Sequence, residues 1–245
     1  MEHTIVEEFK KAAKQGAFPP VYPVGPFVRS SSDKAGESAC LEWLDRQPAG
    51  SVVFVSFGSG GVLSVEQTRE LAAGLEMSGH RFLWVVRMPS HDGESYSYDF
   101  GTDHRNDDDP LACLPDGFLE RTRGRGLAVA SWAPQVRVLS HPAMVAFVSH
   151  YGWNSALESV SAGMPMVVPL YVEQKVNAVI LTEVVGVALR PATEVAAAVK
   201  ELMDPGEKGS AARRWARVLQ EVARLPEGAS RRALTVVVGK WKNAV

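Results

Sequence analysis

The sequence predicts an α/β domain built on a doubly wound parallel sheet, and three observations lead to this expectation. Apolar, strand-like runs alternate with helix-like segments over most of the chain. Several runs, such as "SVVFVSFGSGG" at 51–61 and "MVAFVSH" at 144–150, are almost wholly apolar before they end in polar residues or glycine, as in strands buried on both faces. Strand, helix and strand follow one another within about 40 residues, the spacing of a βαβ unit. Repetition of such units gives a Rossmann-like sheet.

The first fifty residues precede this alternation. "TIVEEFKKAAKQG" has the pattern of a short amphipathic helix closed by Gly16. The prolines of "PPVYPVGPFV" exclude a helix and favour an extended connector or an edge strand. A polar loop, "RSSSDKAGES", leads to "ACLEWLDRQ", a short helix ended by Pro48. We expect residues 1–29 to form a helix and an extended connector between domains, and residues 30–245 to form one Rossmann-like domain.

The alternating elements follow in order from residue 51. Ser64 and Gln67 have the spacing of a capping box, which predicts the start of the first helix. The segment 90–110 is acidic and aperiodic, which favours a solvated loop over the alternative of a cation site. The later strands are "RFLWVVR", "GLAVAS", "MVAFVSH", "MPMVVPL" and "GVALR". The helices are "SVEQTRELAAGLEMSGH", "QVRVLSH", "SALESVSAG", "EQKVNAVILTEV" and three near 193–204, 207–222 and 229–242.

The composition excludes several classes of function. The 245 residues are 46% apolar and 22% charged, with a net charge of −2, so no basic field attracts nucleic acid or an anionic membrane. No run approaches the roughly 18 apolar residues of a membrane span, and the charged N-terminus lacks a signal core. The two cysteines, Cys40 and Cys113, are expected to be reduced thiols. We therefore expect a cytoplasmic protein.

Two kinds of cofactor site are disfavoured by spacing. The histidines do not have the spacing of a metal site, and no HExxH motif occurs. The chain has no P-loop, and "GSGG" is not the GxGxxG motif of a nicotinamide-binding protein. A metal site and a nicotinamide-binding Rossmann protein are thus the weaker alternatives.

Polar residues and glycines follow four of the predicted strands. These stretches are "FGSGG" at 57–61, "SWAPQ" at 131–135, "SHYGWNS" at 149–155 and "PLYVEQ" at 169–174. Open α/β sheets bind ligands beyond the carboxyl ends of their strands. The sequence therefore predicts one polar ligand spread along this rim.

The stretch after residue 149 indicates the chemistry of that ligand. His150 ends a strand, Gly152 permits a sharp turn, and Asn154 and Ser155 fall in the first turn of a helix. Unpaired N–H groups and the positive end of the dipole make such a turn an anion site suited to phosphate. Glu158 lies one turn deeper and could accept hydrogen bonds from ribose hydroxyls. These demands fit a nucleotide; the alternative is that Asn154 and Ser155 cap the helix and Trp153 packs in the core.

Trp132 follows another strand on the same rim. An indole face can stack on a base, a contact worth about 1–3 kcal/mol in nucleic-acid systems. The alternative is a partly buried tryptophan that only packs.

The run 132–174, "WAPQVRVLSHPAMVAFVSHYGWNSALESVSAGMPMVVPLYVEQ", resembles the signature box of the plant family 1 UDP-glycosyltransferases of secondary metabolism. The stretches "VYPVGPF", "CLEWLD", "SVVFVSFGS", "EQTRELAAGLEMSGHRFLWVVR", "LPDGFLERT" and "GLAVASWAPQ" also resemble this family. The likeness is greatest to the branch that glucosylates hydroquinone and monolignols. It covers nearly the whole chain but only the C-terminal half of a typical member.

The resemblance implies the donor-binding domain of a GT-B fold, with UDP-glucose as donor co-substrate and neither a cofactor nor a metal. It implies glucose transfer to a hydroxyl of a small phenolic acceptor, with the catalytic histidine and its aspartate partner in the N-terminal domain. UDP-glucose and the phenol are the partners implied, without nucleic acid or membrane insertion. The implied roles are uracil contact for Trp132 and Ala133, ribose contact for Gln135 and Glu158, diphosphate contact for Ser59, His150, Asn154 and Ser155, and sugar contact for Trp153, Glu173 and Gln174.

The chain also departs from the family pattern. Tyr151 stands where the family usually has cysteine, and Val145 and Ala146 replace small residues, often glycines. "MVVPLYVEQ" is one residue short, and "RPATEVAAAVK" lacks a longer charged loop. Two alternatives to an active transferase therefore stay open: a module that binds UDP or UDP-glucose without catalysis, and an inactive remnant.

Overall fold

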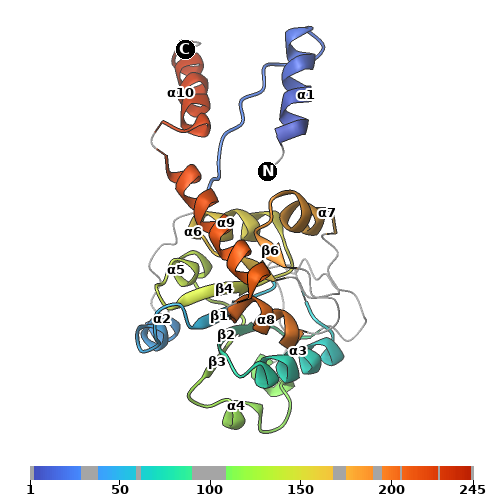
Figure 1. The fold of residues 1–245 in the computed structure, drawn as a ribbon, viewed down its shortest axis with the longest axis vertical. Coiled ribbons are helices and arrows are strands. Elements are labelled where there is room, and N and C mark those ends of the chain that lie inside the picture. The colour runs from blue at the N-terminus through green and yellow to red at the C-terminus, as the bar shows by residue number, and fades with distance from the viewer. Residues whose placement is uncertain are drawn as a thin grey trace.

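The computed structural model describes residues 3–28, 38–58, 62–89, 109–167, 175–189, 195–204, 206–225 and 227–243. Within these ranges one parallel sheet runs in the order β3-β2-β1-β4-β5-β6 (Figure 1). Its strands are β1 (Val52–Val55), β2 (Arg81–Val86), β3 (Gly126–Ala130), β4 (Met144–Val148), β5 (Met166–Val167) and β6 (Ala188–Leu189). The helices are α1 (His3–Lys14), α2 (Ser38–Asp45), α3 (Val65–Ser78), η1 (Pro110–Cys113), α4 (Phe118–Arg121), α5 (Gln135–Leu139), α6 (Trp153–Ala162), α7 (Lys175–Val179), η2 (Ile180–Val184), α8 (Val195–Met203), α9 (Glu207–Arg224) and α10 (Ala229–Lys242).

Helices cover both faces of the sheet, which confirms the doubly wound, Rossmann-like fold class. On one face, Leu71 of α3 and Val199 of α8 pack with Val53 and Phe82 of the sheet. On the other face, α2, α5 and α6 pack against alternate residues of the same strands, with Phe147 of β4 at the centre. Strands β1, β2, β4 and β5 are buried on both sides because every second side chain faces each helix layer, whereas the edge strand β3 is only partly buried. The continuously apolar runs of the sequence have this origin.

The strand order fixes where a ligand can bind. Chain order reverses between β1 and β4, which lie side by side in parallel register. After β1 the chain continues into α3 on one face of the sheet, and after β4 it continues into α6 on the other. Open α/β sheets bind ligands outside the carboxyl ends of the strands at such a reversal. A ligand is therefore expected to bind at the residues that follow β1 and β4.

Most of the predicted elements are confirmed, and the exceptions have local causes. Residues 19–28 form a connector without strand pairing. The helix expected from Ser155 begins at Trp153, because Gly152 already has the extended backbone of a cap residue. The helix expected over 173–184 is seen from Lys175, and its second half is a π-helix, Ile180–Val184. Two short helices, η1 and α4, were not predicted, because four residues are too few to show a period.

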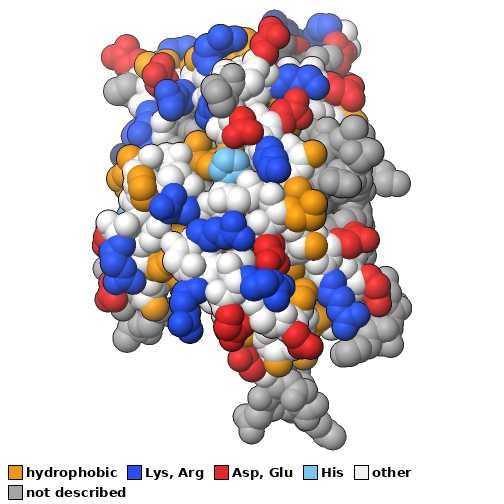
Figure 2. Space-filling view, turned by 60° about the horizontal axis from the view of Figure 1, so that its bottom comes forward, with side chains coloured by type: hydrophobic (Ala, Val, Ile, Leu, Met, Phe, Trp, Pro, Cys, Tyr) orange, Lys and Arg blue, Asp and Glu red, His pale blue; other side chains and the backbone are white. Residues whose placement is uncertain are grey.

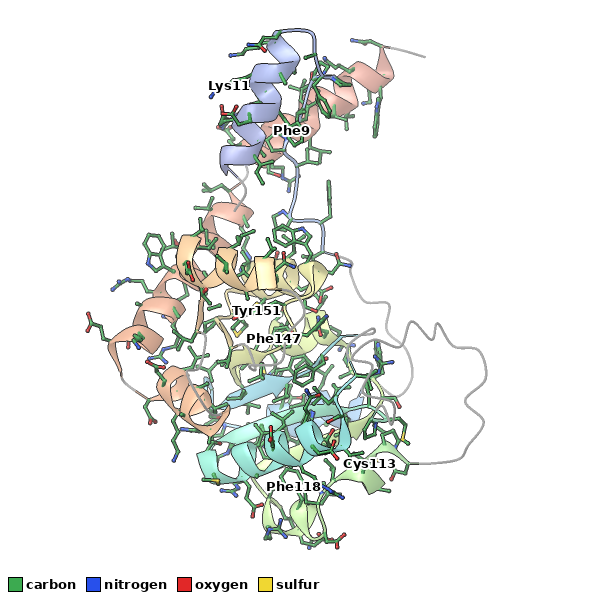
Figure 3. All side chains as sticks on the ribbon, turned by 90° about the vertical axis from the view of Figure 1, so that its right-hand side faces the viewer. Phe9, Lys11, Cys113, Phe118, Phe147 and Tyr151 are labelled. Atoms are coloured by element: carbon green, nitrogen blue, oxygen red, sulfur yellow. The ribbon has the colours of Figure 1, made fainter. Side chains whose placement is uncertain are left out.

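Helices α1 and α10 extend together away from the sheet (Figures 1 and 3). The hydroxyl of Ser230, in α10, accepts a hydrogen bond from the Gly25 N–H at 2.7 Å. The ammonium of Lys240 lies 5.0 Å from the centre of the Tyr22 ring. The two ends of the chain are thus joined in one arm, while the domain boundary at residues 29 and 30 stays a prediction.

Acidic and basic side chains are interspersed over the face of the molecule in Figure 2. This mixed surface agrees with the small net charge. No helix within the described ranges has the length and apolar character needed to cross a membrane.

The capping box at the start of α3 gives the first testable prediction. The Ser64 hydroxyl accepts a hydrogen bond from the Gln67 N–H, and the Gln67 side chain accepts one from the Ser64 N–H. Replacing Ser64 by Ala should lower the free energy of unfolding by about 1 kcal/mol, because one N–H of the first turn loses its acceptor. Urea unfolding measures the loss, and Ser140→Ala, on the exposed end of α5, serves as the control. Equal losses in the two variants would contradict the capping role.

Candidate functional site

The candidate site lies where the turns after β1 and β4 pack against each other. Gly58 follows β1 and has a φ of 69°, in the left-handed region that glycine tolerates. His150 follows β4, and the two turns meet at its ring: a Cβ added to Gly58 would lie 2.6 Å from His150 Cε1. A Cβ added to Gly152 would lie 2.4 Å from His150 Nε2. Both glycines are therefore required by the close approach of this imidazole.

The imidazole of His150 is uncharged at neutral pH. Burial between the two turns, and secondarily the positive charge of Arg87, lower the pKa of His150 to about 4. Its Nδ1 lies 3.4 Å from the Ser149 hydroxyl. A neutral imidazole carries one N–H and can donate one hydrogen bond to an anion.

Helix α6 begins directly after this turn. Gly152 occupies the cap position, and the N–H of Ala156 makes the first hydrogen bond of the helix, to the Gly152 carbonyl at 3.0 Å. The N–H groups of residues 153–155 precede this bond and lie at the positive end of the helix dipole. The alternative in which Asn154 or Ser155 is the cap residue is wrong, because Gly152 holds that position.

Gln135 and Glu158, the two residues predicted to hold a ribose, are in contact with each other. The Gln135 amide nitrogen, from α5, donates to the Ser155 hydroxyl at 3.1 Å and to Glu158 Oε2 at 2.7 Å. These bonds join α5 to α6 across 20 and 23 residues of sequence. The carboxylate of Glu158 has further lone pairs that can accept from hydroxyl groups.

Trp132 lies on the same rim, exposed by 57%. Its position is set by a tight turn after β3, in which Ser131 has a φ of 63° and the Trp132 N–H bonds the Ala130 carbonyl. Trp132 and Gln135 are three positions apart in the chain, so their Cα atoms are at most about 11 Å apart. Its neighbour Ala133 is buried in the core. The indole face is thus open to solvent near the start of α6.

The remaining predicted residues fall into two groups. Trp153 is half-buried and Asn154 exposed at the start of α6, so Trp153 is not a core residue. Ser59, Glu173 and Gln174 lie outside the described residues, as does most of the acidic segment, 90–108. The shortened "MVVPLYVEQ" also lies largely outside them, from residue 168 onward. Elsewhere, the described ranges hold no group of three potential metal ligands.

Tyr151 holds an unusual backbone conformation within the turn. Its φ is 60°, its side chain is fully buried beside the core around Phe147, and its carbonyl accepts from Asn177 at 3.0 Å (Figure 3). Left-handed backbone is uncommon outside glycine and is held only where the surroundings determine it. The bulky side chain is therefore accommodated inward, away from the rim.

Sequence reasoning missed one residue of this rim. Arg87 follows β2, and its Nη1 donates to the Gly58 carbonyl at 3.2 Å. The run "RFLWVVR" ends at this arginine. Applying the rule on strand ends to this second strand would have found it.

The sequence of the chain is similar to known glycosyltransferases. A family model described as UDP-glucoronosyl and UDP-glucosyl transferase matches residues 18–209. Hydroquinone glucosyltransferase of Rauvolfia serpentina is 50% identical over 241 residues, which cover 93% of this chain and 50% of that protein. UDP-glycosyltransferase 72B1 of Arabidopsis thaliana is 49% identical over 240 residues, covering 91% and 49%. The chain spans about half the length of these relatives.

The fold agrees with the sequence comparison. A structure of Phytolacca americana UGT2 with UDP-2fluoro-glucose and pterostilbene superimposes with a TM-score of 0.81 at 47% identity, covering 97% of this chain and 51% of that one. A structure of TcCGT1 in complex with UDP gives a TM-score of 0.83 at 37% identity, covering 97% and 55%. By sequence and by fold, the chain belongs to the UDP-glucoronosyl and UDP-glucosyl transferase family, among its plant members.

Proposed function

We propose that this chain is the UDP-sugar-binding part of a glycosyltransferase that moves glucose from UDP-glucose to a hydroxyl of a small phenol. One observation carries the proposal: the Gln135 amide joins Ser155 and Glu158 at the start of α6, close to the exposed indole of Trp132. This arrangement offers a platform for a base, oxygen acceptors for a ribose and N–H donors for a diphosphate. The names of the relatives, which include a hydroquinone glucosyltransferase, support glucose and a phenol as the substrates.

The resemblance to the plant family 1 UDP-glycosyltransferases supports the following roles, and for Trp132, Gln135, Glu158 and the start of α6 the described positions agree with them. Trp132 stacks on uracil and the Ala133 backbone meets its edge, while Gln135 and Glu158 hold the ribose. Ser59, His150, Asn154 and Ser155 bind the diphosphate, and Trp153, Glu173 and Gln174 bind the sugar. Displacement at the anomeric carbon builds negative charge on the leaving UDP. Fixed N–H donors at the start of α6 would stabilise that charge as it develops.

The isolated chain is expected to bind the donor without transferring glucose. A general base must have a pKa near the operating pH and reach the acceptor hydroxyl. With a pKa of about 4, His150 is a poor base at neutral pH. We propose that the base comes from the part of the family fold that this chain does not match, and that the complete protein works in the cytoplasm.

Titration calorimetry with UDP and UDP-glucose tests the proposal. We expect saturable binding of both ligands by the 245-residue chain, with UMP weaker and ADP weaker still, because the platform and its edge contacts select uracil. An assay of glucose transfer to hydroquinone should give no product with this chain alone. Absence of binding at millimolar UDP would favour the inactive remnant, and turnover would show that the chain holds its own base.

A further inference from the structure

The proposed diphosphate site has a deficit of positive charge. A UDP group brings at least two negative charges to the rim, yet none of the residues assigned to it is a lysine or an arginine. The carboxylate of Glu158 adds negative charge at the start of α6, and His150 is neutral at pH 7. Burying a charge without a partner is costly, and a helix end supplies only about half an elementary charge. A nearby cation would offset this cost.

Arg87 contacts the turn after β1, one of the two turns where the diphosphate would bind. It lies at the carboxyl end of β2, half-buried, and its guanidinium donates to the Gly58 carbonyl. Gly58 in turn abuts the His150 ring. Arg87 also lines a small hollow at the ends of β1 and β2, together with Ser56 and Thr68. Its charge is close enough to His150 to act on that imidazole.

An arginine suits this position better than other side chains. The guanidinium stays protonated at neutral pH although burial lowers its pKa. Its planar fork can donate to the Gly58 carbonyl while the group keeps its positive charge. One side chain can therefore fix the turn after β1 and give it a permanent charge.

We propose that Arg87 is a positioning residue for diphosphate binding. It holds the segment after β1 against His150, and it supplies a fixed positive charge to the carboxyl ends of β1 and β2. This inference rests on the proposed function, because it assumes that a uridine diphosphate binds there. It goes beyond that function by assigning the charge balance to a residue outside the assigned contacts.

A series of variants and ligands tests the inference on the whole chain. Titrations with uridine, UMP and UDP should show that Arg87→Met binds UDP roughly tenfold more weakly, the equivalent of about 1.4 kcal/mol. Uridine affinity should not change, and UMP should fall between. Arg87→Lys keeps the charge and should recover most of the UDP affinity, whereas Arg87→Gln keeps a donor for Gly58 without the charge and should resemble Arg87→Met. Arg69→Met removes an exposed arginine of α3 and is the matched control.

Each other outcome overturns the inference. Equal loss for uridine and UDP would show a merely structural role, and wild-type affinity in Arg87→Gln would show that the charge is irrelevant. Unchanged UDP binding in Arg87→Met, with normal binding by the wild type, removes this inference and leaves the proposed function intact. Failure of the wild type to bind UDP removes both. Circular dichroism and the unfolding midpoint confirm that each variant is folded.

Discussion

Acidification from pH 7 to pH 4 should cost the wild-type chain about 3 kcal/mol more folding stability than it costs a His150→Gln variant. The pKa of His150 is about 4 in the folded chain and about 6.5 when the histidine is exposed. Between these values the unfolded chain binds a proton that the folded chain excludes. Stability is therefore complete above pH 6.5 and falls as the pH drops towards 4, by about 1.4 kcal/mol per pH unit.

Urea unfolding at several pH values between 4 and 7 measures this difference. The carboxylates of the chain also titrate in this range, so the test is the gap between the two curves rather than either curve alone. Glutamine cannot titrate, and its own effect on packing is the same at every pH. Parallel curves for wild type and variant would mean that the imidazole is not held between Gly58 and Gly152 in its neutral form.

Replacement of Trp132 by Ala should weaken UDP binding by a factor of roughly 5 to 150, or about 1–3 kcal/mol. The indole is 57% exposed at the end of β3, so it is free to stack on a base. For the same reason its removal should change the free energy of unfolding by less than about 0.5 kcal/mol. Trp132→Phe keeps an aromatic face of smaller area and should retain part of the affinity.

The matched control for this prediction is Trp241→Ala. Trp241 lies on α10 and is 70% exposed, so both variants remove an exposed indole side chain of the same size. Titration calorimetry should show a loss of UDP affinity in Trp132→Ala alone. Similar losses in both variants would point to a non-specific effect, and no loss in either would place the nucleotide elsewhere on the rim.

The sequence predicted the layered part of the fold well, because its signals are short-range. The capping box of Ser64 and Gln67 depends on residues three apart and was found as expected. The continuously apolar run of β4 identified a strand buried on both faces. By contrast, the four-residue helices η1 and α4 have no periodic signal, and the π-helix after α7 reflects packing that the pattern does not encode.

The candidate site was predictable where a local pattern carried the chemistry. Gly152, Asn154 and Ser155 predict a turn and the start of a helix. In the structure Gly152 is the cap residue of α6, and Asn154 and Ser155 lie in its first turn. The contacts of Gln135 with Ser155 and Glu158 connect residues at least 20 positions apart. From the residues alone these side chains could be placed on one rim but not in contact. The rule on strand ends places Arg87 on this rim, but its contact with Gly58, 29 residues away, is decided only by the fold.

The sequence by itself determined the fold class, the family and the rim on which a ligand would lie, because each depends on the order and periodicity of nearby residues. Three facts were decided by the tertiary structure alone. Strands β1 and β4 are neighbours, the His150 ring fills the space beside two glycines, and Arg87 donates a hydrogen bond to the turn after β1. These facts also set the charge state of the site. Burial and the distance between charges are properties of the folded arrangement, and they lower the pKa of His150 and bring Arg87, on a different strand, into contact with Gly58.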